Sequence, residues 1–313
     1  RLQLTLNIIG AWLAVYVITH GGRGPEGFLG DENDVCMALV MLLPFALQNA
    51  ISLRAAKRLP YIGLSLLSLV AIVITESRGG FLGVVALFGV LLLRSPKKIP
   101  MLLSAGLVIL LAIPFAGDKY WGEVKSISAS EGTGKERMDT WGYVWKMFLD
   151  PKNTIQGVGI SNSPYNIGFY EPASAGISQK TLQGRAVHST FFELLGDQGL
   201  IGLALVGSIF GGSILETVKN GRRLSQLARA RLSTDPGLGR IAAEYSNRLH
   251  IMSVAIQCSW AGALVSSMFI ATLYYPPLWI LVTISAIHAA VTTRIAQAIS
   301  KNEHRAEVEV IPA

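Results

Sequence analysis

The sequence predicts an all-helical bundle of membrane-spanning segments, and three observations carry this prediction. Hydrophobic residues make up 51% of the 313 residues, and charged residues only 15%. In ordinary soluble domains the charged share is about a quarter. The mean hydropathy is +0.45, and the apolar residues gather in long runs separated by short polar segments. Such runs are typical of a protein that crosses a membrane several times.

The apolar runs predict about eight spans. Their approximate limits are 2–18, 35–53, 60–75, 80–93, 100–116, 189–217, 248–273 and 275–293. The third and fourth are short for a full crossing, which tilt or a locally thin bilayer accommodates. The chain begins at Arg1 without a signal-peptide pattern, so we expect it to be the C-terminal part of a longer protein.

Basic residues orient these spans. They gather in two short loops, in a segment between Lys219 and Arg240, and in the C-terminal tail; the two loops hold Arg54, Lys57 and Arg58, and Arg94, Lys97 and Lys98. The positive-inside rule assigns all four to the cytoplasm. Residues 1–116 then hold spans one to five and residues 117–188 an external loop; spans six to eight lie in 189–313, with a cytoplasmic basic loop at 218–247 and a cytoplasmic tail.

The net charge of +7 follows from the same loops and does not indicate a nucleic-acid partner. Cys36 and Cys258 both fall in apolar runs, where cysteine is a small packing residue, so no disulfide is expected. The histidines are scattered over both predicted sides, and no metal site is expected.

Segment 117–188 is the one long external loop that the pattern predicts, and its length indicates a function. Within it, "RMDTWGYVWKMFLD" at 137–150 places Trp141, Val144, Trp145 and Phe148 at helical spacing. An amphipathic helix on the membrane surface or on the bundle is expected. The following "NTIQGVGISNSPYNIG" is rich in Gly, Asn and Ser and predicts an irregular loop.

The stretch "TESRGGFLG" at 75–83 puts two charges between apolar runs, at the external end of two predicted helices. Glu76 can neutralise Arg78, and the glycines permit a tight turn and a close approach of another group. Two interpretations of Arg78 are open. It is an interfacial arginine that snorkels or pairs with Glu76, or a phosphate clamp, because guanidinium donors match phosphate oxygens.

A second candidate site is "GRAVHSTFFELLGDQGLIGL" at 184–203. His188 precedes an apolar helix that Ser189 can cap. A histidine at an interface is either structural or, beside Arg185 and Glu193, a general base, because its pKa lies near the working pH. Glu193 lies in the first turns of the helix, where an unpaired charge is costly.

Two further groups of polar residues lie on the same predicted side. Arg137 stands near Glu136 and Asp139, either as a solvated loop charge or as a ligand. The acidic cluster that contains Asp31 precedes a span; a solvated turn and a cation site are both open, although calcium-loop spacing is absent. Asn33 is a candidate helix cap or sugar ligand.

In order and spacing, "TESRGGFLG", "KERMDTWGYVWKMFLDPKNTIQGVGISNSPY" and "HSTFFELLGDQGLIGL" resemble the O-antigen ligase and polymerase superfamily. The stretch "GFLGDENDVCMALVMLLP" resembles that superfamily's exosortase-associated O-glycosylation ligase branch. The resemblance covers roughly residues 20–215. The family usually has more spans than this chain, which implies that upstream helices are missing.

This resemblance implies a metal-independent, inverting membrane glycosyltransferase without a cofactor, in the bacterial inner membrane, with a periplasmic active site. The donor would be a glycan on undecaprenyl diphosphate, and the acceptor a lipid, a glycan or a protein. Arg78 and Arg137 match arginines near the diphosphate, and His188 and Glu193 match the catalytic motif. Arg185 has no match; its assignment to the diphosphate, and that of Asn33 and Asp31 to sugar or acceptor, come from position alone.

Three other functions are compatible with parts of this pattern. A polysaccharide polymerase uses the same donor chemistry and differs in its acceptor. A transporter of an anionic lipid or solute would show an internal repeat and broken helices near the midplane, and no repeat is found. A structural subunit of a membrane complex would lack a convergent polar pocket in 117–188.

Overall fold

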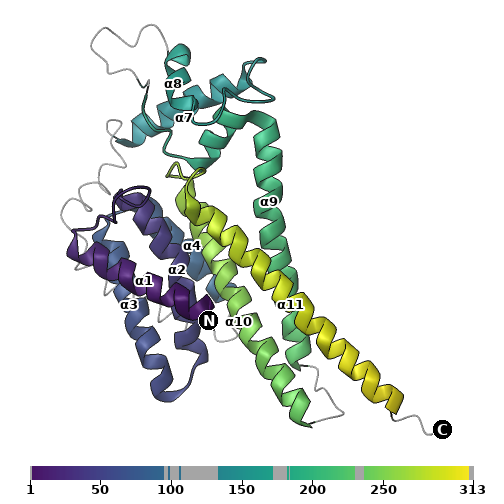
Figure 1. Ribbon diagram of the computed structural model, residues 1–313. Coiled ribbons are helices and arrows are strands. Elements are labelled where there is room, and N and C mark those ends of the chain that lie inside the picture. The colour runs from purple at the N-terminus through teal and green to yellow at the C-terminus, as the bar shows by residue number, and fades with distance from the viewer. Residues whose placement is uncertain are drawn as a thin grey trace.

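The computed structural model describes residues 2–94, 98, 106, 133–171, 182, 184–229 and 236–309. Every regular element among them is a helix, which confirms the predicted fold class. In chain order these are α1 (Leu2–Thr19), α2 (Glu32–Ser52), η1 (Ala55–Arg58), α3 (Leu59–Ile74), α4 (Arg78–Arg94), α7 (Thr133–Leu149), α8 (Ser163–Asn166), η3 (Ile167–Tyr170), α9 (Thr190–Arg229), α10 (Pro236–Ser267) and α11 (Pro276–Glu309). The long helices form a bundle, and α7 and α8 lie across one end of it (Figure 1).

Six helical segments of the described residues are long and apolar enough to cross a membrane: Leu2–Thr19, Glu32–Ser52, Ala55–Ile74, Thr190–Gln226, Ala243–Ser267 and Pro276–Ala298. The predicted span at 80–93 corresponds to α4, which has 17 residues. The predicted span at 100–116 lies outside the described residues, apart from Gly106. The chain is therefore a multi-pass membrane protein, and its exact number of spans stays a prediction.

The helices α2 and α10 form the centre of the bundle. They are the most buried of the candidate spans, and the Ser259 hydroxyl on α10 donates a 2.6 Å hydrogen bond to the Met41 carbonyl on α2. Small residues bring α4 against this centre. A Cβ on Gly83 of α4 would overlap the hydroxyl oxygen of Ser266 on α10. Close backbone approach at small residues is a common basis of helix packing in membranes.

The predicted span at 189–217 is bent. Gly199 has φ 59° and ψ −152°, which interrupts α9, and the bend is visible at the upper end of α9 (Figure 1). The interruption leaves Leu200 and Ile201 with free N–H groups, which donate to the carbonyls of Thr154 and Ile155 at 2.9 and 3.1 Å. The helix therefore breaks where a loop from the external segment pairs with its backbone.

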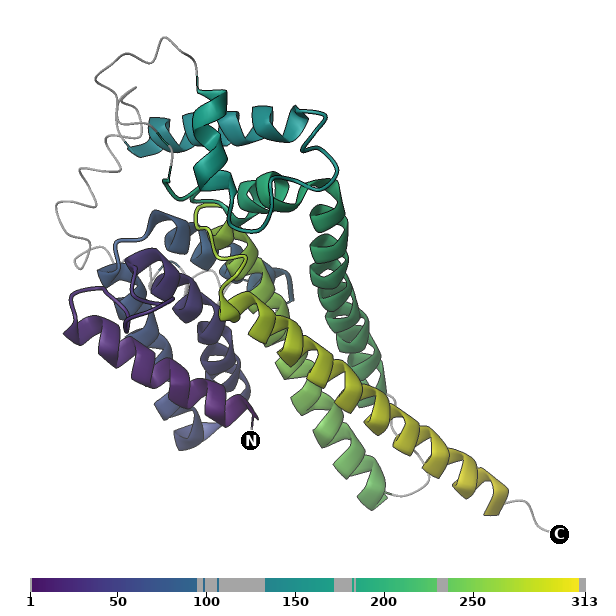
Figure 2. The same ribbon diagram turned by 45° about the horizontal axis from the view of Figure 1, so that its top comes forward.

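Two of the predicted basic segments lie away from α7. The one predicted as a loop at 218–247 is helical at both ends, because α9 continues to Arg229 and α10 begins at Pro236. The two views agree that η1, the C-terminal end of α9 and the N-terminal end of α10 lie at the end of the bundle opposite α7 and α8 (Figures 1 and 2). Arg54 directly precedes η1, and Arg222 and Arg223 lie near the C-terminal end of α9. The bundle therefore has one basic end and one end capped by α7.

Candidate active site

The "SRGG" turn joins α3 to α4 at the capped end. Glu76 has a left-handed backbone, with φ 54°. The Ser77 hydroxyl then accepts a hydrogen bond from the Gly80 N–H at 3.1 Å, which caps the start of α4. The same hydroxyl donates to the Asn33 side-chain oxygen at 2.8 Å. Arg78 is thus the first residue of a helix whose start is held from two directions.

The two glycines of this turn allow neighbouring helices to approach. A Cβ on Gly80 would overlap the Sγ of Cys36 on α2, and a Cβ on Gly79 would lie 3.0 Å from the Cβ of Phe269. The predicted close approach at these glycines is therefore confirmed.

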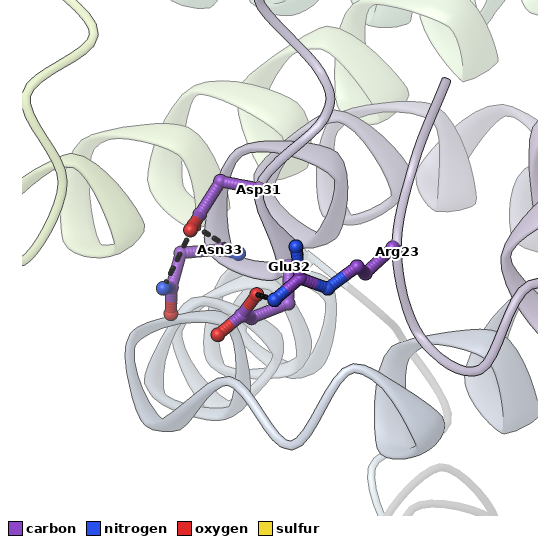
Figure 3. Close-up of polar contacts among 4 residues, drawn as sticks. All are labelled: Arg23, Asp31, Glu32 and Asn33. Carbon is purple, nitrogen blue, oxygen red and sulfur yellow. Dashed lines mark hydrogen bonds and ion pairs between the residues drawn. The ribbon is translucent and has the colours of Figure 1, made fainter. Parts of the chain in front are cut away.

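The loop between α1 and α2 and the first turn of α2 carry four polar residues that contact one another in two pairs (Figure 3). The Arg23 guanidinium faces the Glu32 carboxylate at 4.0 Å. Asp31 caps α2 by accepting from the backbone N–H of Asn33 at 2.8 Å and from its side-chain amide at 2.9 Å. Asp31 thus positions Asn33 at the edge of the site, and Asn33 positions Ser77.

These elements enclose a cavity of about 370 Å³, which we call the arginine pocket. Its charged and amide side chains are Arg23, Glu32, Asn33, Glu76, Arg78 and Arg137. The first three come from the α1–α2 segment, the next two from the "SRGG" turn, and Arg137 from α7. Three guanidinium groups against the two carboxylates of Glu32 and Glu76 leave the lining with a net positive charge, and guanidinium donors match the oxygens of an anionic ligand such as phosphate.

The helix α7 is the predicted amphipathic helix, and it lies on the end of the bundle. Val144 and Met147 are fully buried, whereas Trp145 faces outward and is 46% exposed. The Trp141 indole donates to the Val187 carbonyl at 3.0 Å, and its ring stacks on Phe192 with centroids 5.3 Å apart. These contacts fix α7, and with it Arg137, against the segment that carries the predicted histidine.

His188 lies beside Arg137 in a second cavity of about 330 Å³, which we call the histidine pocket. It is lined by Glu136, Arg137, Thr140, Arg185, Ala186 and His188. The His188 backbone is left-handed, with φ 51°. Arg137 lines both cavities, so the two pockets adjoin at this residue.

The surroundings of His188 keep its imidazole neutral near neutral pH. Loss of hydration lowers the pKa of His188 below its ordinary value of 6.5, although part of the residue is exposed. Repulsion by Arg137 lowers the pKa further, and attraction to Asp31 partly offsets these effects. A neutral imidazole can accept a proton, as a general base must.

Two predicted site residues lie elsewhere. Arg185 pairs with Glu136 in the histidine pocket and does not line the arginine pocket. Glu193 lines neither of these two pockets; its carboxylate accepts from the Leu273 N–H at 3.3 Å, in the turn between α10 and α11. The side chain thus ties the start of α9 to that turn.

Asp197 is a site-building residue that sequence reasoning missed. It is fully buried, and its carboxylate accepts from the N–H groups of Ser161 and Ser163 at 2.7 and 2.8 Å and from the Tyr274 hydroxyl at 2.8 Å. It therefore holds the loop after α7 to the bundle. The signal was an acidic residue in the otherwise apolar run "LLGDQGLIGL", because buried carboxylates need partners.

Among the described residues, no group of three or more His, Cys, Asp or Glu side chains is arranged to hold a metal ion. The acidic cluster at the start of α2 instead uses Asp31 as a helix cap and Glu32 as the partner of Arg23.

Residues 63–207 match the family model described as O-antigen ligase. The matched segment contains Arg78, Arg137 and His188, and it leaves out Arg23 and Asn33. No curated protein matches the chain. The described residues thus hold six apolar helices that can span a membrane, and residues 63–207 of this chain form a domain of the O-antigen ligase family.

Proposed function

We propose that the protein transfers a glycan from undecaprenyl diphosphate to a periplasmic acceptor, at the outer face of the bacterial inner membrane. The O-antigen ligase domain at 63–207 supports a ligase- or polymerase-type membrane glycosyltransferase. The single observation that carries the finer proposal is that Arg137 lines both pockets. A cavity rich in guanidinium groups and a cavity with a neutral histidine are thereby adjacent, as a charged leaving group and an acceptor base require.

In this proposal the arginine pocket binds the diphosphate of the donor. Negative charge grows on the leaving diphosphate as the sugar–phosphate bond breaks. Arg78 and Arg137 stabilise that charge through donors that are in place before the reaction. The capped start of α4 holds the Arg78 backbone, and the contacts of Trp141 hold α7 and Arg137, so little reorganisation is needed.

The histidine pocket then receives the acceptor. His188 takes the proton of the acceptor hydroxyl while the acceptor oxygen bonds to the anomeric carbon and the diphosphate departs. Attack from the face opposite the leaving group inverts the anomeric configuration. No metal ion or cofactor takes part in this proposed step.

The remaining candidates have supporting roles in this scheme. We assign Arg185, which shares a cavity with His188, to the acceptor rather than to the diphosphate. We assign Glu193 a positioning role, because its carboxylate binds backbone at the start of the helix that follows His188. Asn33 lies where it can reach the sugar next to the diphosphate, and Asp31 holds Asn33 in place.

The test is glycan transfer by the purified protein in detergent. The protein is mixed with an undecaprenyl-diphosphate-linked glycan and, separately, with lipid, glycan and protein acceptors, and products are identified by mass spectrometry and by the anomeric configuration. We expect inverted product in the presence of a chelator. His188→Ala should abolish transfer while donor binding persists, because the base acts on the acceptor. Transfer at the wild-type rate by His188→Ala would overturn the proposal.

The acceptor decides between closely related activities. A lengthened glycan that is still on the donor lipid would identify a polymerase, and a glycan on a lipid or a protein would identify a ligase. Glycosylated protein is the product expected of the O-glycosylation ligase branch.

A further inference from the structure

Arg23 is the one arginine of the arginine pocket that lies outside the family-matched residues. It sits in the loop between α1 and α2, ahead of residues 63–207, and lines the pocket together with Arg78 and Arg137. The domain match therefore accounts for two of the three guanidinium groups. The third guanidinium group, that of Arg23, comes from a loop that precedes the matched domain in the chain.

The backbone on both sides of Arg23 is fixed. Gly22 has φ 91°, and a Cβ there would overlap the Ile74 carbonyl oxygen at the end of α3. A Cβ on Gly24 would overlap the carbonyl oxygen of Leu29 and crowd Val35. Arg23 is thus presented from a loop that is packed against the base of the "SRGG" turn, and this packing sets where its side chain starts.

The side chain itself is loosely held. The Arg23 side chain is 73% exposed, and its guanidinium lies 4.0 Å from the carboxylate of Glu32, which is 37% exposed. The ion pair between Arg248 and Glu244 shows that equal exposure does not by itself prevent a close contact. The Arg248 side chain is also 73% exposed, and it contacts the Glu244 carboxylate at 2.7 Å. Exposed ion pairs contribute little stability even at close range, so an anionic ligand in the pocket can compete with Glu32 for Arg23.

We propose that Arg23 is a third ligand for the phosphate groups of the lipid-linked donor, and that it exchanges between Glu32 and those phosphates. Glu32 is thus a competitor that sets how readily Arg23 engages the donor. This inference rests on the proposed function, and it adds a determinant of donor affinity from outside the matched domain.

The experiment is a double-mutant cycle on donor-lipid binding. Arg23→Gln, Glu32→Gln and the double variant are purified in detergent, and the Kd for undecaprenyl diphosphate is measured, with undecaprenyl monophosphate as the comparison. Arg23→Gln should raise the Kd about fivefold to tenfold. Glu32→Gln should lower it about twofold to threefold, because Arg23 loses its competitor. In the double variant, Glu32→Gln should no longer lower the Kd, because Arg23 is absent.

Arg248→Gln is the matched control, because it removes an equally exposed arginine from an ion pair on α10, away from the residues that line the arginine pocket, and it should leave the Kd unchanged. Thermal unfolding of each variant checks the fold. An unchanged Kd in Arg23→Gln, or a gain from Glu32→Gln that persists without Arg23, would overturn the inference. If Arg78→Ala weakens binding and Arg23→Gln does not, only this inference fails; if neither weakens binding, the proposed function fails as well.

Discussion

The left-handed residues Glu76 and His188 build the two pockets in the same way. Their φ values are 54° and 51°, a conformation that non-glycine residues adopt at a cost and that often marks functional sites. Each is followed by a serine whose hydroxyl accepts from a backbone N–H three residues on. Ser77 accepts from Gly80 at 3.1 Å, and Ser189 accepts from Phe192 at 3.5 Å. This shared arrangement of a left-handed residue followed by a capping serine places Arg78 at the first residue of α4 and His188 just before α9.

The fork geometry of Arg78 should matter as much as its charge. If Arg78 clamps a diphosphate, Arg78→Lys should be nearly as damaging as Arg78→Ala, because lysine keeps the charge but not the paired donors. Either change should slow transfer about a hundredfold, which corresponds to about 3 kcal/mol of lost transition-state stabilisation. The measurement is kcat/KM for glycan transfer with purified variants.

Arg94→Lys, at the other end of α4, is the matched control and should keep wild-type kcat/KM. Full activity in Arg78→Ala would show that the turn is only an interfacial, paired structure.

The pH dependence of transfer should report the charges around His188. Because the pKa of His188 lies below its ordinary value of 6.5 and the base must be neutral, the acid limb of the activity profile should have its midpoint below pH 6.5. Arg137→Gln removes a repelling charge, so the pKa should rise and the acid limb should move to higher pH. Asp31→Asn removes an attracting charge, so the limb should move to lower pH.

The measurement is the pH profile of kcat/KM, which reports groups of the free enzyme. Shifts in the same direction for the two variants would contradict the assignment of this limb to His188.

At the scale of a single helix, the glycines of α4 differ in whether a neighbouring helix packs against them. Gly80 has no room for a Cβ because of the Cys36 thiol, whereas Gly89 on the same helix has open space. Gly80→Ala should lower the free energy of unfolding by about 1 to 3 kcal/mol through overpacking. Gly89→Ala should leave stability unchanged or slightly raised, since alanine favours a helix.

The measurement is the thermal unfolding midpoint in detergent. Adding Cys36→Ala to Gly80→Ala removes the colliding sulfur and should restore part of the loss. Equal midpoints for Gly80→Ala and Gly89→Ala would show that α2 and α4 do not approach as closely as described.

The pairing of α9 with the loop after α7 was predicted only in part by the sequence patterns. Apolar periodicity predicted a continuous span at 189–217, but Gly199 breaks it. The break lets the loop pair with helix backbone, and Asp197 ties the same loop through two N–H groups. Hydrophobic spacing reports which residues avoid water, and it does not report where a second segment replaces helix hydrogen bonds.

At the scale of the whole molecule, the distribution of charge predicts the orientation in the membrane. Segment 117–188 should face the periplasm, and the basic segment 218–247, which includes the end of α9 and the start of α10, should face the cytoplasm. The native cysteines, Cys36 and Cys258, are both buried, so a new exposed cysteine can be labelled selectively. In intact cells with a permeable outer membrane, an impermeant thiol reagent should label Lys152→Cys and spare Arg223→Cys.

Both positions are exposed in the structure, so after cell lysis both variants should react. If only Arg223→Cys were labelled in intact cells, the topology would be the opposite of the predicted one, and the proposal of a periplasmic site would be wrong.

The sequence by itself determined the helical class, the membrane character and the segments that carry the candidate chemistry. Length, apolar runs and local motifs are properties of neighbouring residues, and they can be read without distances. The motifs around Arg78, Arg137 and His188 also indicated the superfamily, which the match at 63–207 confirmed.

Only the tertiary structure decided how these residues are grouped. Arg137 joins the two pockets, Arg185 lies with His188 rather than Arg78, and Arg23 enters from outside the matched domain. The positions of Arg137 and Arg23 depend on contacts between segments far apart in the chain, and Arg185, which is close to His188 in the sequence, pairs with Glu136 on α7. Local patterns carry no information on such distances, because the free energy that sets them comes from packing between whole helices.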